Sequence, residues 1–257
     1  MNLSILDRES SVPSPFKPKT VLVVGATGGI GQAFCQQVLS QFPDAKLIRM
    51  ARSTDKLPTL DVPTQDIAID LTREVDIETA IAELPEKIDI DWVFIATGWL
   101  HDDTYQPEKS YRSLSAEHLA LSYQINAFGP ALVIKHLLAR LNPKHPVVFG
   151  VLTARVGSIS DNRMGGWYSY RSSKAALNML IKNFAIECSR SRRPLAIIGL
   201  QPGTTDTALS APFQRGVSPE NLQSPKYTAG QLVTVMGAVM PEDSGSLFDF
   251  LGLPFDP

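Results

Sequence analysis

The sequence predicts an α/β fold with one doubly wound, mainly parallel sheet of about seven strands and helices on both faces. Apolar runs rich in β-branched residues alternate with amphipathic stretches long enough to form crossover helices, which is typical of a parallel sheet. The length of 257 residues and the 44% hydrophobic content allow a single domain with a sizeable core. Such folds bind ligands in loops beyond the carboxyl ends of the strands, so we expect the functional residues there.

Six of the strands can be located in the sequence. The apolar runs lie at residues 20–25, 46–50, 65–69, 91–96, 147–152 and 195–200. Helices are expected at residues 30–41, 73–84, 116–141, 169–191 and 228–239, punctuated by Pro, Gly or Ser. We expect residues 19–257 to form the domain. Residues 1–18 contain three prolines and no continuous apolar stretch, which indicates a flexible arm and not a signal peptide.

Composition argues against several classes of function. Lys and Arg number 24 against 26 Asp and Glu, so nothing indicates a nucleic-acid or membrane partner, and we expect a small molecule. No apolar run reaches the roughly 20 residues that span a bilayer. Cys35 and Cys188 lie far apart in expected helices, which indicates core residues of a cytoplasmic protein and not a disulfide. The four histidines have no metal-ligand spacing, so no metal is expected.

A glycine loop connects the first expected strand to the first expected helix. It reads Gly25-Ala26-Thr27-Gly28-Gly29-Ile30-Gly31, with the spacing G-x-x-x-G-x-G. The glycines let backbone amides approach a pyrophosphate at the helix N-terminus, where partial positive charge favours an anion. A turn with a structural role alone is the alternative, but the position between strand and helix favours nucleotide binding.

Tyr170 and Lys174 lie four residues apart, about one helical turn, so a helix would place the phenol and the ammonium group on one face. A nearby cation lowers the pKa of a phenol, and such a tyrosine can exchange a proton with an alcohol or a carbonyl oxygen. The same spacing is common on exposed helix faces. The pair alone therefore does not establish catalysis.

Taken in this order, the glycine loop and the Tyr170/Lys174 pair resemble the short-chain dehydrogenase/reductase family over about residues 19–252. The segments Arg155-Val156-Gly157-Ser158-Ile159 and Gly165-Gly166-Trp167-Tyr168 are similar to those of its C-factor and sniffer-like carbonyl reductase branch. The resemblance implies a Rossmann-type fold and hydride transfer between a nicotinamide cofactor and a carbonyl or secondary alcohol. By analogy with the family, we also expect a homodimer or homotetramer that pairs through the two long helices.

Residues after the second expected strand favour NADP over NAD. An acidic residue there would bind the ribose 2′-OH and repel a 2′-phosphate. The chain instead has Arg52 and Ser53, whose guanidinium and hydroxyl groups suit a phosphate. A solvated surface arginine is the alternative, because Gly28 supplies no second basic residue in the glycine loop.

Two further strand ends carry cofactor contacts that the resemblance implies. Asp70 and Leu71 would lie near the adenine, although Asp70 is equally suited to a helix N-terminus. Ala96, Thr97 and Gly98 would lie near the adenosine ribose. This segment departs from the family's Asn-Asn-Ala-Gly and keeps its glycine alone.

The segment after the last expected strand resembles the family's Pro-Gly-x-x-x-Thr motif, which holds the nicotinamide carboxamide. A simple Pro-Gly turn is the alternative. Residues 208–226 would follow as a lid over the substrate. The expected cofactor contacts here are Pro202, Gly203, Thr205 and Thr207.

The proton-transfer group departs from the family at one position. Asn126 matches an asparagine at a helix distortion that binds a water touching the catalytic lysine, with a local bend as the alternative. The serine that binds the substrate carbonyl is replaced by Ala154. We favour Thr153 as its substitute, if the strand end is twisted or bulged. Ser158 on the same loop, or Tyr170 alone, are the alternatives.

These residues support two hypotheses of different classes. The first is an NADP-dependent oxidoreductase in which Tyr170 is the acid and base, and Lys174 depresses its pKa and holds the nicotinamide ribose, so that both residues also contact the cofactor. In it, Asn126 anchors the relay water and Thr153 polarises the carbonyl. The second is a nucleotide-binding signalling or regulatory protein that keeps the fold but has little turnover. Ala154 and the altered segment before Gly98 motivate the second hypothesis.

Overall fold

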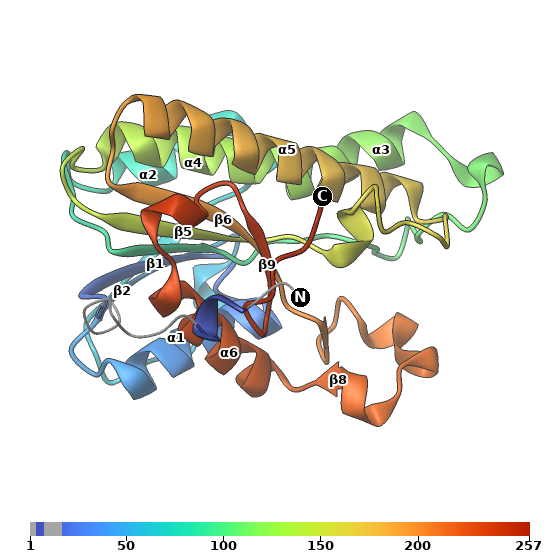
Figure 1. Ribbon diagram of the computed structural model, residues 1–257, viewed down its shortest axis with the longest axis horizontal. Coiled ribbons are helices and arrows are strands. Elements are labelled where there is room, and N and C mark those ends of the chain that lie inside the picture. The colour runs from blue at the N-terminus through green and yellow to red at the C-terminus, as the bar shows by residue number, and fades with distance from the viewer. Residues whose placement is uncertain (1–3, 8–16) are drawn as a thin grey trace.

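The central sheet is parallel throughout. The computed structural model describes residues 4–7 and 17–257. Seven strands pair in the order β3-β2-β1-β4-β5-β6-β9, starting in the middle with β1 and winding outward in both directions (Figure 1). This order confirms the predicted doubly wound fold. The strands are β1 (Thr20–Val24), β2 (Lys46–Ala51), β3 (Thr64–Ala68), β4 (Trp92–Ile95), β5 (Val147–Leu152), β6 (Leu195–Gln201) and β9 (Leu247–Asp249).

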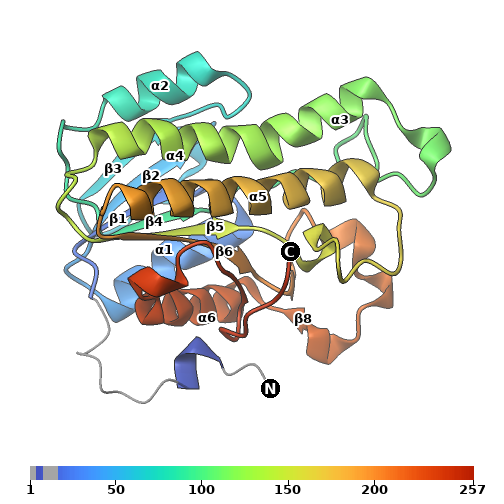
Figure 2. The same ribbon diagram turned by 45° about the horizontal axis from the view of Figure 1, so that its top comes forward.

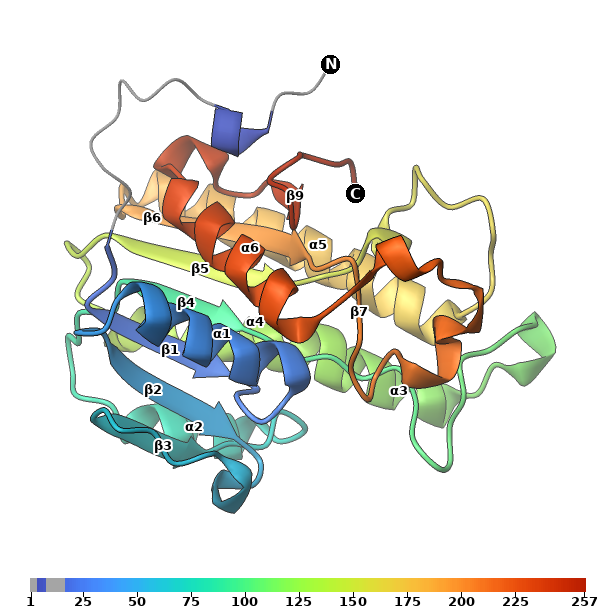
Figure 3. The ribbon, with the colours of Figure 1, turned by 90° about the horizontal axis from the view of Figure 1, so that it is seen from below.

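Helices cover both faces of the sheet. On one face lie α1 (Gly29–Gln41) and α6 (Pro225–Ala238), side by side in Figure 3. On the other lie α2 (Glu74–Ala82), α4 (Gly129–Arg140) and α5 (Tyr168–Arg190) (Figure 1). Each face packs its own apolar cluster, because central parallel strands are apolar on both sides. The rigid layers leave the strand ends and their loops to form the site.

The long helix expected at residues 116–141 is divided by a distortion. α3 (Ala116–Tyr123) passes into a π-helical turn at Gln124–Phe128 and then into α4, in one line beside α5 (Figure 2). The turn contains Asn126, where the resemblance implied a distortion. A Cβ on Gly129 would lie 2.7 Å from the Cβ of Leu71, so this glycine lets the helix approach the loop after β3.

An ion pair between the buried Arg49 and the exposed Asp66 joins the two strands at the edge of the sheet. Arg49 of β2 donates from Nε and Nη2 to the two carboxylate oxygens of Asp66 in β3, at 2.7 and 2.6 Å. Its Nη1 donates to the carbonyl of Pro58 at 2.7 Å. The bidentate geometry holds β2 and β3 in register. Their carboxyl ends are therefore fixed beside each other, directly before Arg52 and Asp70.

The expectation of a flexible arm is wrong for residues 4–7. The backbone amide of Ile5 donates to Gly252 O at 3.0 Å, and the Ser4 hydroxyl donates to Leu251 O at 2.7 Å. Ile5 is buried in the cluster that packs α1 and α6. The short apolar pair Ile5-Leu6 is too brief to give a sequence signal for this contact. The rest of the arm up to residue 16 lies outside the described residues.

The expected lid at residues 208–226 has more regular structure than its sequence indicates. Two 3₁₀ helices, Ala211–Gly216 and Pro219–Asn221, stand beyond the carboxyl ends of the strands (Figure 3). A two-stranded sheet of β7 (Thr204–Thr205) and β8 (Leu222–Gln223) closes the base of the lid. Strands of two residues are too short for a hydrophobic pattern, so the sequence does not reveal them.

Candidate active site

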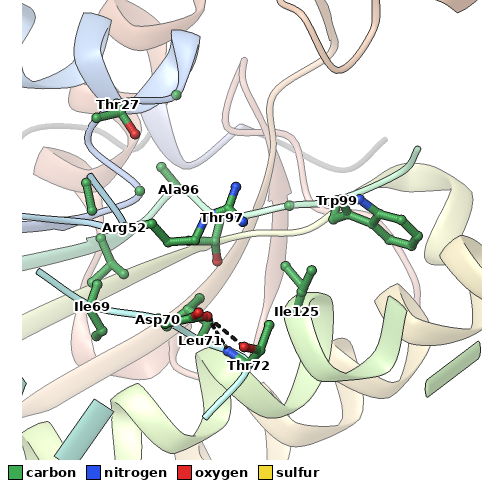
Figure 4. A pocket seen from close by; sticks show the side chains of 15 residues that line it. Thr27, Arg52, Ile69, Asp70, Leu71, Thr72, Ala96, Thr97, Trp99 and Ile125 are labelled. Atoms are coloured by element: carbon green, nitrogen blue, oxygen red, sulfur yellow. Dashed lines mark hydrogen bonds between the residues drawn. The ribbon is translucent and has the colours of Figure 1, made fainter. Parts of the chain in front are cut away.

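A cavity of about 190 Å³ opens at the carboxyl ends of the first four strands (Figure 4). Ser53 does not line it and instead begins a short 3₁₀ helix at Thr54–Lys56. The expected cofactor residues that do line it are Gly25, Thr27, Gly28, Arg52, Asp70, Leu71, Ala96, Thr97 and Gly98.

The glycine loop forms one wall of this cavity and leads into α1. Gly25 has a φ of +84°, which disfavours residues with a Cβ. A Cβ on Gly31 would lie 2.3 Å from Gly25 O, so the turn closes on bare backbone. Gly28 caps α1 without a side-chain hydrogen bond, and the first amides of the helix remain available to an anion. The loop fits a pyrophosphate.

Arg52 and Asp70 face the same cavity from neighbouring strand ends. Partial burial opposes ionisation of Asp70. Hydrogen bonds from the Thr72 amide and hydroxyl, with the charges of Arg52 and Arg73, nevertheless hold the pKa of this carboxyl below its ordinary value. Asp70 is therefore an anion beside a guanidinium group that is exposed at the cavity edge. The pair offers an acceptor to an amino group and a fork to a phosphate.

Two further observations test whether a nicotinamide dinucleotide fits. The Thr97 hydroxyl is buried in the cavity wall and has no partner among the described residues, so it is open to a ligand hydroxyl. A Cβ on Gly98 would lie 3.9 Å from Lys174 Nζ, which joins this cavity to the Tyr170/Lys174 pair. The residues present fit the cofactor.

A second cavity of about 330 Å³ lies between the glycine loop, the end of β6 and the lid. Tyr170, Thr153 and Ala154 line it together with Ile30. It also contains the expected nicotinamide-binding residues Pro202, Gly203, Thr205 and Thr207. Its remaining wall combines apolar with polar residues. The apolar ones are Leu100, Val156, Trp167, Leu209, Phe213 and Val217, and the polar ones are Arg155, Gln201, Thr204 and Ser210.

The Pro-Gly segment meets the glycine loop in this second cavity. A Cβ on Gly29 would lie 2.8 Å from Thr207 Cγ2, so the two loops pack directly against each other. The Thr205 hydroxyl is buried and bonds to Thr228 Oγ1 at 3.0 Å and to Pro202 O at 3.3 Å. It stabilises the loop internally, whereas Thr207 faces the cavity and is half-buried.

Tyr170 and Lys174 share one face of α5, but their electrostatics differ from the expectation. Burial raises the pKa of Tyr170 to about 12 and lowers the pKa of Lys174 to about 7. Lys174 Nζ lies 5.9 Å from the centre of the Tyr170 ring and donates to Leu152 O at 2.9 Å. The expectation that Lys174 depresses the phenol's pKa is therefore wrong in this state, because desolvation dominates both groups.

Thr153 does not offer its proton to the cavity. Its side chain is 3% exposed, and its hydroxyl donates to Asn178 Oδ1 at 2.6 Å. A hydroxyl has one proton, so this arrangement does not support Thr153 as the group that polarises a carbonyl. Ser158 lines a different cavity, where its Oγ accepts from the Asp161 amide. Among these alternatives, Tyr170 alone lines the substrate cavity with a hydroxyl that has no hydrogen-bond partner among the described residues.

Asn126 braces the loop after β4. Its Oδ1 accepts from the Trp99 amide at 2.7 Å, and its Nδ2 donates to Trp99 O at 2.8 Å. Nδ2 also lies within hydrogen-bond distance of Ser122 and Ser173. The side chain thus ties the loop after β4 to the helix that contains Asn126. Its role in anchoring a water stays a prediction.

The comparisons with known proteins agree with this geometry. The model of the short chain dehydrogenase family matches residues 19–217. The chain belongs to this family. It is 32% identical over 229 residues to 1-hydroxy-2-glutathionyl-2-methyl-3-butene dehydrogenase of Rhodococcus sp. (strain AD45), covering 88% of this chain and 94% of the relative. It is 31% identical over 136 residues to the C-signal of Myxococcus xanthus, covering 52% of this chain and 75% of that protein.

A solved structure of NADPH-bound carbonyl reductase from chicken fatty liver matches this fold with a TM-score of 0.81 and 20% sequence identity. The match covers 93% of this chain and 99% of that protein. The resemblance to the family and to its C-factor and carbonyl reductase relatives is therefore confirmed. The chain is an NAD(P)-dependent oxidoreductase of the short-chain dehydrogenase type.

Several residues of this short-chain dehydrogenase were not expected from the sequence. Thr72 and Ile125 line the cofactor cavity, and Trp167 and Phe213 line the substrate cavity. The position of Trp167 three residues before Tyr170 could have indicated that it lines the substrate cavity. Phe213 lies in the lid, where the sequence does not show which side chains face the cavity. Among residues 4–7 and 17–257, no cluster of metal-ligating side chains and no helix able to cross a membrane is found.

Proposed function

We propose that the protein reduces a carbonyl to a secondary alcohol with NADPH and that Tyr170 supplies the proton. One observation carries the proposal. Tyr170 lines the same cavity as Ile30, Gly203 and Thr207, which belong to the two loops that would hold the nicotinamide. Lys174 lies beside Gly98 at the junction with the cofactor cavity. A carbonyl in the substrate cavity would thus meet a proton donor and the reducing end of the cofactor together.

The residues divide the work of the reaction. NADPH, when bound, supplies a hydride to the carbonyl carbon. Tyr170 donates its hydroxyl proton to the carbonyl oxygen, and its pKa of about 12 keeps it protonated at neutral pH. Lys174, held against Leu152 O, orients the nicotinamide ribose. A protonated phenol suits reduction, whereas alcohol oxidation needs the phenolate.

The substrate cavity favours an apolar carbonyl compound. Trp167 and Phe213 pack edge to face, with ring centres 5.1 Å apart, over the space in front of Tyr170. Burial of apolar surface against such a wall contributes about 25 cal/mol per Å² before the costs of binding. We therefore propose a ketone with an apolar or aromatic substituent. The name of the Rhodococcus relative, a dehydrogenase, supports carbonyl and alcohol chemistry.

Cofactor preference has its own support and its own test. Arg52 stands at the edge of the cofactor cavity, and the chicken structure contains NADPH. Titration with NADPH and NADH should give tighter binding of NADPH. Arg52→Ala should remove most of this preference, since a charge-assisted contact contributes about 1.5–3 kcal/mol, or roughly tenfold to hundredfold in affinity. Equal affinities of the native protein for both cofactors would contradict the assignment to NADP.

A second function keeps the fold but not the turnover. Ala154 at the serine position and the Thr153 proton bound to Asn178 leave the carbonyl one donor short. These observations favour a nucleotide-binding regulatory protein, and the Myxococcus relative is named a signal. A panel of aldehydes and ketones with NADPH separates the two. Turnover of any carbonyl supports the enzyme, and tight NADPH binding without turnover across the panel supports the regulator.

Location and assembly are separate proposals. We propose a cytoplasmic protein that forms a homodimer or homotetramer through the helices α3, α4 and α5. Exposed apolar side chains support a paired surface: Phe128 in the π-helical turn between α3 and α4, and Met179 and Ile186 on α5. Size-exclusion chromatography with light scattering measures the mass, and a monomer at micromolar concentration would contradict the assembly.

A further inference from the structure

We propose that Glu108 is a positioning residue for Tyr170, because its buried carboxylate caps the first turn of α5 from a distant loop. The proposal rests on the proposed function, in which Tyr170 is the proton donor. Glu108 belongs to the segment between β4 and α3 and lies 61 positions from its main partner, Ser169. Glu108 itself lines neither the cofactor nor the substrate cavity and would act through the helix that carries Tyr170.

The start of α5 lacks a cap of its own. Trp167 is the N-cap residue, adopts the left-handed conformation with φ 51° and ψ 43°, and makes no side-chain cap bond. Gly165 and Gly166 before it also have positive φ. The first amides of a helix have no partners within the helix and need them from elsewhere. The helix that holds Tyr170 in its first turn therefore depends on external acceptors.

Glu108 supplies these acceptors. Its Oε2 accepts from the Ser169 amide at 3.2 Å, and its Oε1 accepts from the Ser169 hydroxyl. Its backbone oxygen accepts from the Trp167 amide at 2.6 Å. Glu108 thus binds the two residues that flank Tyr168 at the beginning of α5. A carboxylate is well suited to this place, because the N-terminus of a helix carries partial positive charge.

The burial of Glu108 makes the contact specific. Its side chain is 2% exposed, and a carboxylate so removed from water needs strong partners. His118 Nδ1 lies 3.2 Å from Oε1 and provides one more. The His118 ring is stacked on Tyr105, with centres 4.9 Å apart, and meets Trp99 edge to face at 5.3 Å. Aromatic packing therefore fixes the histidine that faces Glu108.

The same network reaches the cofactor loop. Ser122 Oγ donates to Ser169 O at 3.1 Å and pairs with Ser173 Oγ at 3.1 Å. Asn126 Nδ2 bonds to both serines and to Trp99 O. The loop after β4 and the first turn of α5 are thus tied to one buried set of hydrogen bonds. Loss of Glu108 would shift Tyr170 relative to the bound cofactor.

The test compares Glu108→Ala and Glu108→Gln with a matched control. Glu117→Ala removes an exposed carboxylate beside His118 and leaves the network intact. We expect Glu108→Ala to lower kcat about tenfold to hundredfold, since a misplacement near 1 Å costs about that much, while NADPH affinity stays close to native. Glu108→Gln keeps one acceptor oxygen for the Ser169 amide and should recover part of kcat. A kcat for Glu108→Ala equal to that of Glu117→Ala would overturn the proposal.

A second readout does not depend on turnover. Ultraviolet absorbance against pH, with the corresponding Tyr170→Phe protein subtracted, reports the titration of Tyr170. In Glu108→Gln we expect the pKa of Tyr170 to move from its raised value toward the ordinary one, because a looser first turn admits water. If the native protein turns over no carbonyl but this titration shifts, the proposed function fails and the positioning role stands. An unchanged titration in both Glu108→Gln and Ser169→Ala overturns the positioning role, even if Glu108→Ala does not fold.

Discussion

At the residue scale, the contacts around Tyr170 determine which hydroxyl groups are available to a substrate carbonyl. Ala154 lines the substrate cavity beside Tyr170 and presents a methyl group where related enzymes have a serine hydroxyl. Thr153 is committed to Asn178 and does not replace that hydroxyl. In the proposed reduction, Tyr170 alone among these residues would stabilise the negative charge that develops on the carbonyl oxygen.

Ala154→Ser should raise turnover. The change adds one hydroxyl at a half-buried position that faces the cavity. Because removal of one donor to an oxyanion can lower kcat by about 10²–10³-fold, we expect a gain of at least about tenfold in kcat for carbonyl reduction. Steady-state oxidation of NADPH measures it. Thr153→Val, which removes the neighbouring hydroxyl, is the matched control. An Ala154→Ser protein that is no faster than native would contradict the claim that the site lacks a hydrogen-bond donor to the carbonyl oxygen.

Lys174 should make the stability of the protein depend on pH. Its pKa is about 7 in the folded chain and about 10.4 in an unfolded one, so the unfolded state binds more protons between these values. The free energy of unfolding should therefore rise with pH from 7 toward 10, by at most about 1.4 kcal/mol per pH unit. Urea denaturation at pH 7 and pH 9 measures the slope. Lys174→Met should reduce the dependence of the unfolding free energy on pH. Equal slopes in both proteins would contradict a lowered pKa of Lys174 in the folded chain.

The sequence located residues by their position next to a strand or helix end. It did not reveal which side chains from other elements they contact. Gly25, Arg52 and Tyr170 could be located because their positions relative to strand ends are local properties of the chain. The partner of Thr153 could not be located, because Asn178 lies on another element. The shift of the Tyr170 pKa was missed for the same reason, since burial depends on the whole assembled site.

At the element scale, the lid is attached to the pocket by aromatic contacts. Phe213 lies 5.1 Å from the Trp167 ring and 5.3 Å from the His101 ring, measured between centres. His101 Nε2 also bonds to Leu209 O at 3.2 Å. The lid is thereby held over the substrate cavity from two sides.

Phe213→Ala should weaken substrate use without affecting the cofactor. Two aromatic contacts contribute about 0.5–1.5 kcal/mol each, so we expect kcat/KM for an apolar ketone to fall about tenfold. NADPH affinity should stay close to native, because Phe213 does not line the cofactor cavity. Tyr227→Ala removes an exposed ring outside both cavities and serves as the control. A Phe213→Ala protein with native kcat/KM would contradict the proposed wall.

Elements were predictable where their pattern extends over several turns or alternations. The five helices and six of the strands lie within a few residues of their expected places, whereas β7 and β8 have two residues each. The π-helical turn at Gln124–Phe128 could not be derived from periodicity and came from the resemblance at Asn126. β9 follows Gly245 and Ser246 in a stretch too short to distinguish from a loop.

At the scale of the whole molecule, the described part of the N-terminal segment joins the core. Ile5 is 4% exposed against the loop at Gly252, whereas its neighbour Leu6 is 37% exposed. Ile5→Ala should lower the free energy of unfolding by about 2 kcal/mol, as expected for a buried Ile→Ala change. Leu6→Ala should change it by less than about 0.5 kcal/mol. Denaturant titration measures both, and equal effects would contradict the docking of this segment.

The central claim is that Tyr170 supplies the proton for NADPH-dependent carbonyl reduction. The most direct measurement is kcat of Tyr170→Phe on a carbonyl that the native protein reduces, with Tyr168→Phe as the control. Tyr168 is 38% exposed at the first position of α5 and lines neither cavity. We predict a fall of about 10²–10⁴-fold in Tyr170→Phe with NADPH affinity preserved, and native turnover in Tyr168→Phe. Native turnover in Tyr170→Phe would contradict the claim.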